Sequence, residues 1–142
     1  MTDSRPQPIR TPFSDFFWDG TRANRLMIQR CAACGSYQHP PGAICARCGS
    51  SSMVPTEVSG RGAIHSFTVV RHVFHPGFAK HVPYVLGRIE LEEQKNLFLI
   101  ANIVDAMPKD IDSGTKVKVV FERRGDDVLP QFTPIDSRGE SP

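Results

Sequence analysis

Four cysteines form two closely spaced pairs in the first half of the chain. The pairs are Cys31–Cys34 and Cys45–Cys48, each of the form CxxC with ten residues between them, and the sequence has no other cysteine. Two such pairs at close range supply four thiolates to a tetrahedral metal ion, most often zinc. The glycine after each second cysteine suits a turn that needs a residue with positive φ. The spacing therefore predicts a structural zinc site at these four residues, with iron in a rubredoxin-like site as the alternative.

Such a site would support folding rather than chemistry. A zinc ion with four protein ligands has no open coordination position, so we do not expect it to activate water. Metal binding supplies about 10–16 kcal/mol of apparent free energy in comparable modules. A segment of roughly 20 residues cannot build a sufficient core without it. Redox-active dithiols fit two adjacent pairs less well, and His39 is not needed as a ligand where four thiolates are present.

Composition and charge limit the possible partners. The chain has 142 residues, of which 39% are hydrophobic, enough for one ordinary domain or two small ones. It has no run of about 18 apolar residues and no apolar leader, so we expect a cytoplasmic protein without a membrane partner. The formal net charge is +2. Four thiolates around one zinc ion would lower it by about 2, so overall charge gives no support to nonspecific nucleic-acid binding.

The rest of the chain is mainly β in pattern. We expect a flexible arm at 1–12, a helical lead-in and metal ribbon at 13–52, a β domain at 53–136 and a flexible tail at 137–142. The first strand should run from 54 to 70, bent by Gly60 and Gly62. Further strands are expected at 83–91, 97–104, 115–122 and 128–135. Five short strands separated by Gly- and Asp-rich turns are typical of an OB-fold barrel.

The chain resembles the OB-fold proteins with a rubredoxin-like zinc ribbon that accompany acyl-CoA enzymes. The matching segments are FFWDG (16–20), LMIQRCAACGSYQHPP (26–41), CARCG (45–49), GRGAIHSFTVV (60–70) and PYVLGRIEL (83–91). The resemblance covers roughly residues 13–135. It implies a noncatalytic partner of a thiolase-fold enzyme, such as a condensing thiolase, a hydroxymethylglutaryl-CoA synthase or a retro-aldolase of steroid side chains. In such assemblies this subunit bridges or completes the complex and lies near acyl-CoA.

Cations and aromatic residues on the first strand and in the loop after it are candidate contacts for acyl-CoA or for the partner. They are Arg61, His65, Arg71, His72, Phe74, His75 and Phe78. Cationic groups beside aromatic rings suit an adenine ring and phosphates, and the loop between the first two strands is a common ligand-binding edge of OB-folds. The alternative, which we favour, is a loop that contacts solvent, the barrel or a partner without touching CoA.

An aromatic cluster precedes the ribbon. It comprises Phe13, Phe16, Phe17 and Trp18. Packing of this helix on the ribbon or barrel is slightly favoured, and docking in a groove of a partner is the alternative, because aromatic residues are enriched in the cores of interfaces. No catalytic residue is predicted. The four cysteines are committed to metal, and Ser66 and Thr68 lie in a strand without a GxSxG motif.

Two other functions compete with that of an accessory subunit. OB-folds and zinc ribbons both bind single-stranded nucleic acid, but the near-zero charge and several acidic residues of the β domain argue against it. Those residues are Glu90, Glu92, Glu93, Asp126 and Asp127. An electron-transfer ribbon containing iron is the other, and the colour and elemental content of the purified protein distinguish it.

Overall fold

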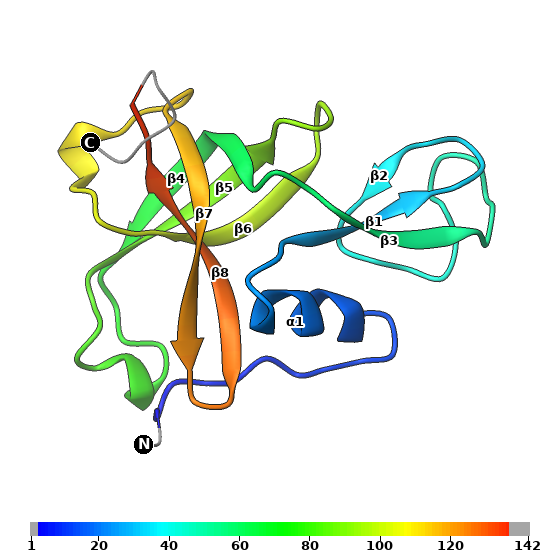
Figure 1. Cartoon of the computed structure of the whole chain (residues 1–142). Coiled ribbons are helices and arrows are strands. Elements are labelled where there is room, and N and C mark those ends of the chain that lie inside the picture. The colour runs from blue at the N-terminus through cyan, green and yellow to red at the C-terminus, as the bar shows by residue number, and fades with distance from the viewer. Residues whose placement is uncertain (1–2, 137–142) are drawn as a thin grey trace.

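The computed structural model describes residues 3–136, which contain one short α-helix, eight strands and two single-turn 3-10 helices, at Pro76–Phe78 and Pro108–Asp110. The elements are α1 (Asp15–Arg22), β1 (Met27–Cys31), β2 (Tyr37–Gln38), β3 (Met53–Glu57), β4 (Arg61–Val70), β5 (Tyr84–Leu91), β6 (Phe98–Ile103), β7 (Lys116–Arg124) and β8 (Asp127–Pro134) (Figure 1). The predicted mainly β fold with a short helical lead-in is confirmed. The tail predicted at 137–142 lies outside the described residues. Within 3–136, no helix is long and apolar enough to span a membrane.

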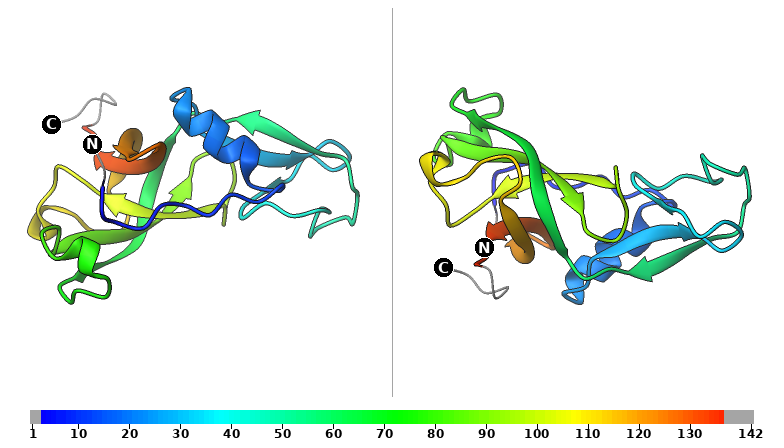
Figure 2. Two further views of the ribbon diagram at one scale, coloured as in Figure 1. Left: turned by 90° about the horizontal axis from the view of Figure 1, so that it is seen from below. Right: turned by 90° about the horizontal axis from the view of Figure 1, so that it is seen from above.

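The strands form two separate sheets. Figures 1 and 2 show a small three-stranded sheet, in the order β2-β1-β3, beside a closed barrel in the order β4-β5-β6-β8-β7. The paired strands are antiparallel except β6 and β8, which run parallel and pair only at Ile103 and Phe132. The five-stranded barrel expected from the sequence is therefore present, and its weakest seam lies between β6 and β8.

The expected first strand of the barrel is divided in two. The sequence predicts one bent strand from 54 to 70, but β3 pairs along its whole length with β1, from Met27 opposite Glu57 to Cys31 opposite Met53. The barrel begins only at Arg61, after Gly60, whose φ is +78°. A β pattern predicts a strand but not the strand that it pairs with, so the expected continuity was wrong.

The segment before α1 lies against the barrel. The sequence predicts residues 1–12 to be a flexible arm, yet from residue 3 onward they run in extended form beneath the barrel (Figure 2, left). The backbone of Ser4 packs on Gly77. Arg10 then joins this segment to the helix, because its Nη1 lies 2.9 Å from a carboxylate oxygen of Asp19. This segment thus contacts the β4–β5 loop at one end and α1 at the other.

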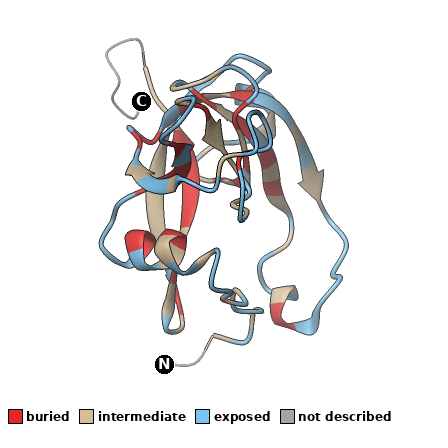
Figure 3. Ribbon diagram, turned by 90° about the vertical axis from the view of Figure 1, so that its right-hand side faces the viewer, coloured by how far each residue is buried: buried red, intermediate tan, exposed pale blue. Residues whose placement is uncertain are grey.

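A single hydrophobic core connects helix, ribbon and barrel. Ile64, Ile89 and Phe132 fill the barrel and are at most 1% exposed. Phe17 of α1 and Ile28 of β1 belong to the same cluster, and Figure 3 shows buried stretches both on the helix and on strands. Burying each such side chain contributes about 1.5–3 kcal/mol, so the two sheets are coupled through the helix.

His39 forms part of the contact between the ribbon and the helix. Its ring centroid lies 5.4 Å from that of Phe17. Burial lowers the pKa of His39 to about 4, because the charged imidazolium is poorly solvated among apolar neighbours. The imidazole is therefore neutral at pH 7.

Mild acid should destabilise the protein through His39. The folded-state pKa is below the unfolded value of about 6.5, so protonation favours the unfolded chain, and stability falls as the pH falls from about 6.5 toward 4. Between pH 7.5 and 5.5 the loss should be roughly 1 kcal/mol. Chemical denaturation of the metal-loaded protein at both pH values measures it.

Replacement of His39 should remove this part of the pH dependence. We expect His39→Leu to lose less stability on acidification than the wild type, whereas His72→Leu, at an exposed position, should behave like the wild type. An equal loss in all three proteins would contradict the assignment.

Candidate functional site

The four cysteine side chains meet at the end of the ribbon. Their Sγ atoms all lie within 4.8 Å of one another, and the distances Cys31–Cys48 and Cys34–Cys45 are 3.6 and 3.7 Å. A tetrahedral zinc ion with Zn–S bonds of about 2.3 Å needs sulfur atoms about 3.8 Å apart. A disulfide would need about 2.05 Å. The four thiols are therefore placed to bind one metal ion.

Both CxxC pairs are held by the same local structure. The amide of Gly35 donates to the carbonyl oxygen of Cys31, and that of Gly49 to the carbonyl oxygen of Cys45, each at 2.8 Å. The two glycines have φ of +80° and +79°, which confirms the expected positive φ after each second cysteine. The two CxxC pairs therefore form matching turns, and their cysteine side chains face one another.

Backbone amides favour the thiolate form that a metal needs. The amide of Cys34 donates to Cys31 Sγ at 3.4 Å, and that of Arg47 to Cys45 Sγ at 3.3 Å. The backbone N–H of Ser36 is the main cause that lowers the pKa of Cys34 to about 6. Because the four sulfur atoms face one another, an ion among them would have four protein ligands. This is the arrangement of a structural site rather than a catalytic one.

The structure spreads the predicted acyl-CoA or partner contacts over different parts of the barrel. Arg61 begins β4 and Arg71 follows its end, and the ten residues of this strand span about 33 Å at full extension. His65 lies between them on the outer face, with its ring 4.8 Å from that of Phe98. Arg88 covers the same Phe98 ring at 3.8 Å. These residues therefore do not converge on one binding site.

The predicted contact residues in the β4–β5 loop also face different surroundings. Phe74 is 80% exposed and its ring lies 4.6 Å from that of His72. His75 turns back on the loop, where its Nδ1 accepts a hydrogen bond from the amide of Gly77. Phe78 packs toward the barrel, 5.5 Å from the ring of Tyr84. Phe74 thus faces solvent, and Phe78 is the member of the predicted set that reaches the groove described below.

The aromatic residues before the ribbon mostly pack inward. Phe17 is 5% exposed, and Phe16 and Trp18 are partly buried against the core. Phe13 is 51% exposed. Packing, the favoured interpretation, therefore accounts for three of the four residues and leaves Phe13 available to a partner.

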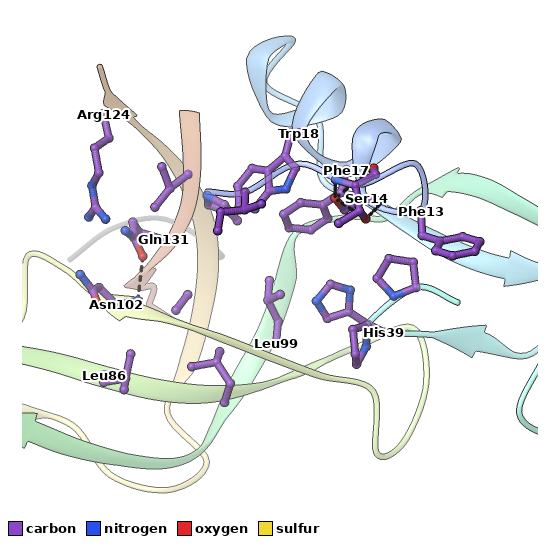
Figure 4. Close-up of a pocket in the computed structure, with 18 of the residues that line it drawn as sticks. Phe13, Ser14, Phe17, Trp18, His39, Leu86, Leu99, Asn102, Arg124 and Gln131 are labelled. Atoms are coloured by element: carbon purple, nitrogen blue, oxygen red, sulfur yellow. Dashed lines mark hydrogen bonds between the residues drawn. The ribbon is translucent and has the colours of Figure 1, made fainter. Parts of the chain in front are cut away.

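A groove of about 640 Å³ lies between the helix, the ribbon and the barrel. We call it the helix–barrel groove. Figure 4 shows Phe17 and Trp18 on one side, Leu86 and Leu99 on the other, and His39 at the ribbon end. Other apolar lining residues are Ile9, Phe13, Pro40, Pro41, Phe78, Ile100, Ala101, Leu129 and Pro130. The outer face of the second and third barrel strands is the usual ligand-binding face of an OB-fold, and here it forms the floor of the groove.

Polar groups gather at the end of the groove opposite His39. The side chain of Arg124 is 7% exposed and its Nη2 donates to Glu122 at 2.9 Å, but its Nε has no hydrogen-bond partner. Beside it, Gln131 Oε1 accepts a hydrogen bond of 2.7 Å from the amide of Asn102 (Figure 4). This bond bridges the weak seam between β6 and β8.

The groove could not be predicted from the sequence, because its walls come from segments far apart in the chain. A signal was present in the alternation of β5 and β6. Leu86 and Ile100 occupy outward positions, between the buried residues Val85 and Gly87 and between Leu99 and Ala101. Apolar residues on the outward face of a barrel strand indicate that something covers that face.

Comparisons with known proteins match both parts of the chain. Residues 18–54 match the ChsH2 rubredoxin-like zinc ribbon domain, and residues 55–122 match the ChsH2 C-terminal OB-fold domain. A probable enoyl-CoA hydratase alpha subunit of Thermomonospora curvata is 36% identical over 96% of this chain and 42% of its own length. The chain thus spans less than half of that relative.

Other relatives match over most of their own length. A DUF35 domain-containing scaffold protein of Methanocaldococcus jannaschii is 36% identical over 79% of this chain and 83% of its own. In the solved Ltp2-ChsH2(DUF35) aldolase, one chain is 35% identical with a TM-score of 0.81, over 90% of this chain and 98% of that one. The protein therefore belongs to the DUF35 family, with the ChsH2-type zinc ribbon followed by an OB-fold domain.

Proposed function

We propose that the protein is a noncatalytic accessory subunit of an acyl-CoA enzyme complex, with a thiolase-fold enzyme as its partner. One observation carries the proposal: the chain superposes on nearly all of one chain of the Ltp2-ChsH2(DUF35) aldolase. Its whole fold thus corresponds to a component of an enzyme complex. The relatives named as scaffold proteins and as a hydratase subunit support the same role.

The side chains of the described residues support a role in binding. All four cysteines belong to the metal cluster, which leaves no thiol free for acyl transfer. The groove is lined mainly by apolar groups, and its buried cation, Arg124, is paired with Glu122. Such a lining suits docking or ligand binding rather than proton transfer.

We further propose the β4–β5 loop as a contact with the partner enzyme. Phe74 is 80% exposed and its neighbour Val73 39%. Between 71 and 83 the loop carries Arg71 and Lys80 and no acidic residue. An exposed aromatic anchor beside cations fits a partner surface that is apolar at its centre and acidic around it. The floor of the groove offers apolar side chains where a nucleic-acid site would need cations, which disfavours that alternative.

The bound metal should be zinc. Elemental analysis of purified protein should give about one zinc per chain, and a red, iron-containing protein would contradict this assignment. Cys31→Ser should lower the melting temperature by roughly 10 °C or more, because loss of a buried ligand weakens a site worth about 10–16 kcal/mol. Ser51→Ala, at an exposed position beside the ribbon, is the matched control and should melt like the wild type.

Assembly with the partner tests the function itself. A thiolase-fold acyl-CoA enzyme encoded beside this protein should copurify with it and turn over faster in its presence. Phe74→Ser should weaken the complex about thirtyfold, as expected for an aromatic anchor worth roughly 2 kcal/mol.

Ile44→Ser is the matched control for the docking loop, since Ile44 is 55% exposed on the ribbon. It should assemble normally. If enzyme assembly and turnover are the same with and without this protein, it is not an accessory subunit. If Phe74→Ser and Ile44→Ser bind equally well, the docking site lies elsewhere.

A further inference from the structure

We infer that β6 pairs with an extended peptide segment of the partner enzyme, which lies in the helix–barrel groove and bonds to the backbone N–H and carbonyl group of Ile100. The inference rests on the proposed function and deepens it, because it states how the partner is held. The pairing site is the open part of the seam between β6 and β8.

The backbone groups of Ile100 face away from β5. In an antiparallel pair, alternate residues direct both the N–H and the carbonyl group to the neighbouring strand. The amide of Leu91 donates to the carbonyl oxygen of Leu97 at 2.9 Å. Each second residue from there on, Leu99 and Ala101, therefore faces β5 in the same way. Ile100 lies between those two and directs its N–H and carbonyl group to the other side, toward β8.

Pro130 stops β8 from closing the barrel at this point. The two strands pair at Ile103 and Phe132, where the amide of Val104 donates to the carbonyl oxygen of Phe132 at 2.8 Å. The next step of a parallel ladder would run from the N–H of residue 130 to the carbonyl oxygen of Ile100. Proline has no N–H, so this bond cannot form and the ladder ends.

Only a side chain bridges the seam beyond that point. In a continued ladder the amide of Asn102 would donate to the carbonyl oxygen of Pro130, but it donates to Gln131 Oε1 at 2.7 Å. Within residues 3–136, Ile100 has no hydrogen bond on this side. An unpaired N–H and carbonyl group on one strand residue is the pattern to which an extended peptide adds as a further strand.

The open edge borders the groove. Ile100 is 60% exposed, and Leu99 and Ala101 on either side of it also line the groove. These two side chains are 4% and 6% exposed and belong to the barrel core, so the groove meets β6 along its edge as well as on its outer face. The lining of the groove is mainly apolar, and we therefore expect apolar side chains on the bound segment.

The position of the edge favours a single peptide segment of another protein. The edge lies inside the groove, between the helix, the ribbon and the barrel, so the β6 edges of two copies of this chain cannot meet. The extended segment before α1 contributes Ile9 to the lining, but none of its described residues bonds to Ile100. Phe78 of the β4–β5 loop also lines the groove, which makes the groove continuous with the proposed partner contact at Phe74.

Hydrogen–deuterium exchange tests the inference on the full-length, zinc-loaded protein, alone and in complex with the copurifying thiolase-fold enzyme. In the protein alone, the amide of Ile100 should exchange faster than those of Leu99 and Ala101, which face β5. In the complex it should exchange roughly tenfold more slowly. Unchanged exchange at Ile100 in an assembled complex overturns the inference and leaves the accessory role intact, whereas both are wrong if the two proteins do not assemble.

Two substitutions act on the edge itself. Ile100→Pro removes the outward N–H without removing a bond to β5, and it should weaken the complex about tenfold, whereas Ile100→Val keeps this N–H and should bind like the wild type. Pro130→Val supplies the N–H that the ladder lacks, so that β8 can close on Ile100 and exclude the segment, and it too should weaken the complex about tenfold. Pro134→Val, in the same strand but outside the groove, is its matched control. The inference fails if Ile100→Pro binds like Ile100→Val, or if Pro130→Val binds as tightly as Pro134→Val.

Discussion

The meeting of four cysteine side chains at the end of the ribbon is the constraint on which the rest of the structure depends. Residues 32–52 contain few buried apolar side chains apart from Cys45, so hydrophobic burial alone would not fix their path. One ion bound by both CxxC turns would fix where the chain leaves Cys34 and where it returns at Cys45. The turn from His39 to Pro41 lies between those points and forms the ribbon end of the groove. A metal ion at this site would therefore shape a surface that it does not touch.

Helix α1, which forms one wall of the groove, also depends on contacts with the rest of the protein. Helix α1 has eight residues and no side-chain cap at Ser14, and a helix of this length is marginal by itself. Burial of Phe17 fixes one face of it. Arg10 joins Asp19 to the preceding segment, and Arg22 at the end of the helix lies 3.3 Å from Asp127, the first residue of β8. Exposed pairs of this kind are individually weak, so the buried aromatic ring dominates and the ion pairs orient the helix around it.

The sequence could predict the features that depend on residues close together in the chain. The metal site depends on four residues within a stretch of 18, and the barrel on alternation within single strands, so both could be predicted. The partner of β3 could not, because the β pattern of Met53–Glu57 does not indicate which strand it pairs with. The loop residues were grouped by their proximity in sequence, whereas an extended strand separates Arg61 from Arg71. Only Phe78 of that set reaches the groove.

The groove lies where the helix, the ribbon and the barrel meet, so binding there would affect the stability of all three. Ligands that bind only the folded arrangement stabilise it by mass action, so an occupant touching Trp18, His39 and Leu86 would hold helix, ribbon and barrel together. Apolar residues on the outer face of β5 and β6 contact water while nothing covers the groove, and this exposure is unfavourable. Ile100, for example, is 60% exposed. That cost is offset when an apolar molecule covers them. The groove runs from the cysteine ribbon at one end to the β6–β8 seam, which pairs only at Ile103 and Phe132, at the other, so whatever covers it joins parts of the fold that backbone pairing joins weakly.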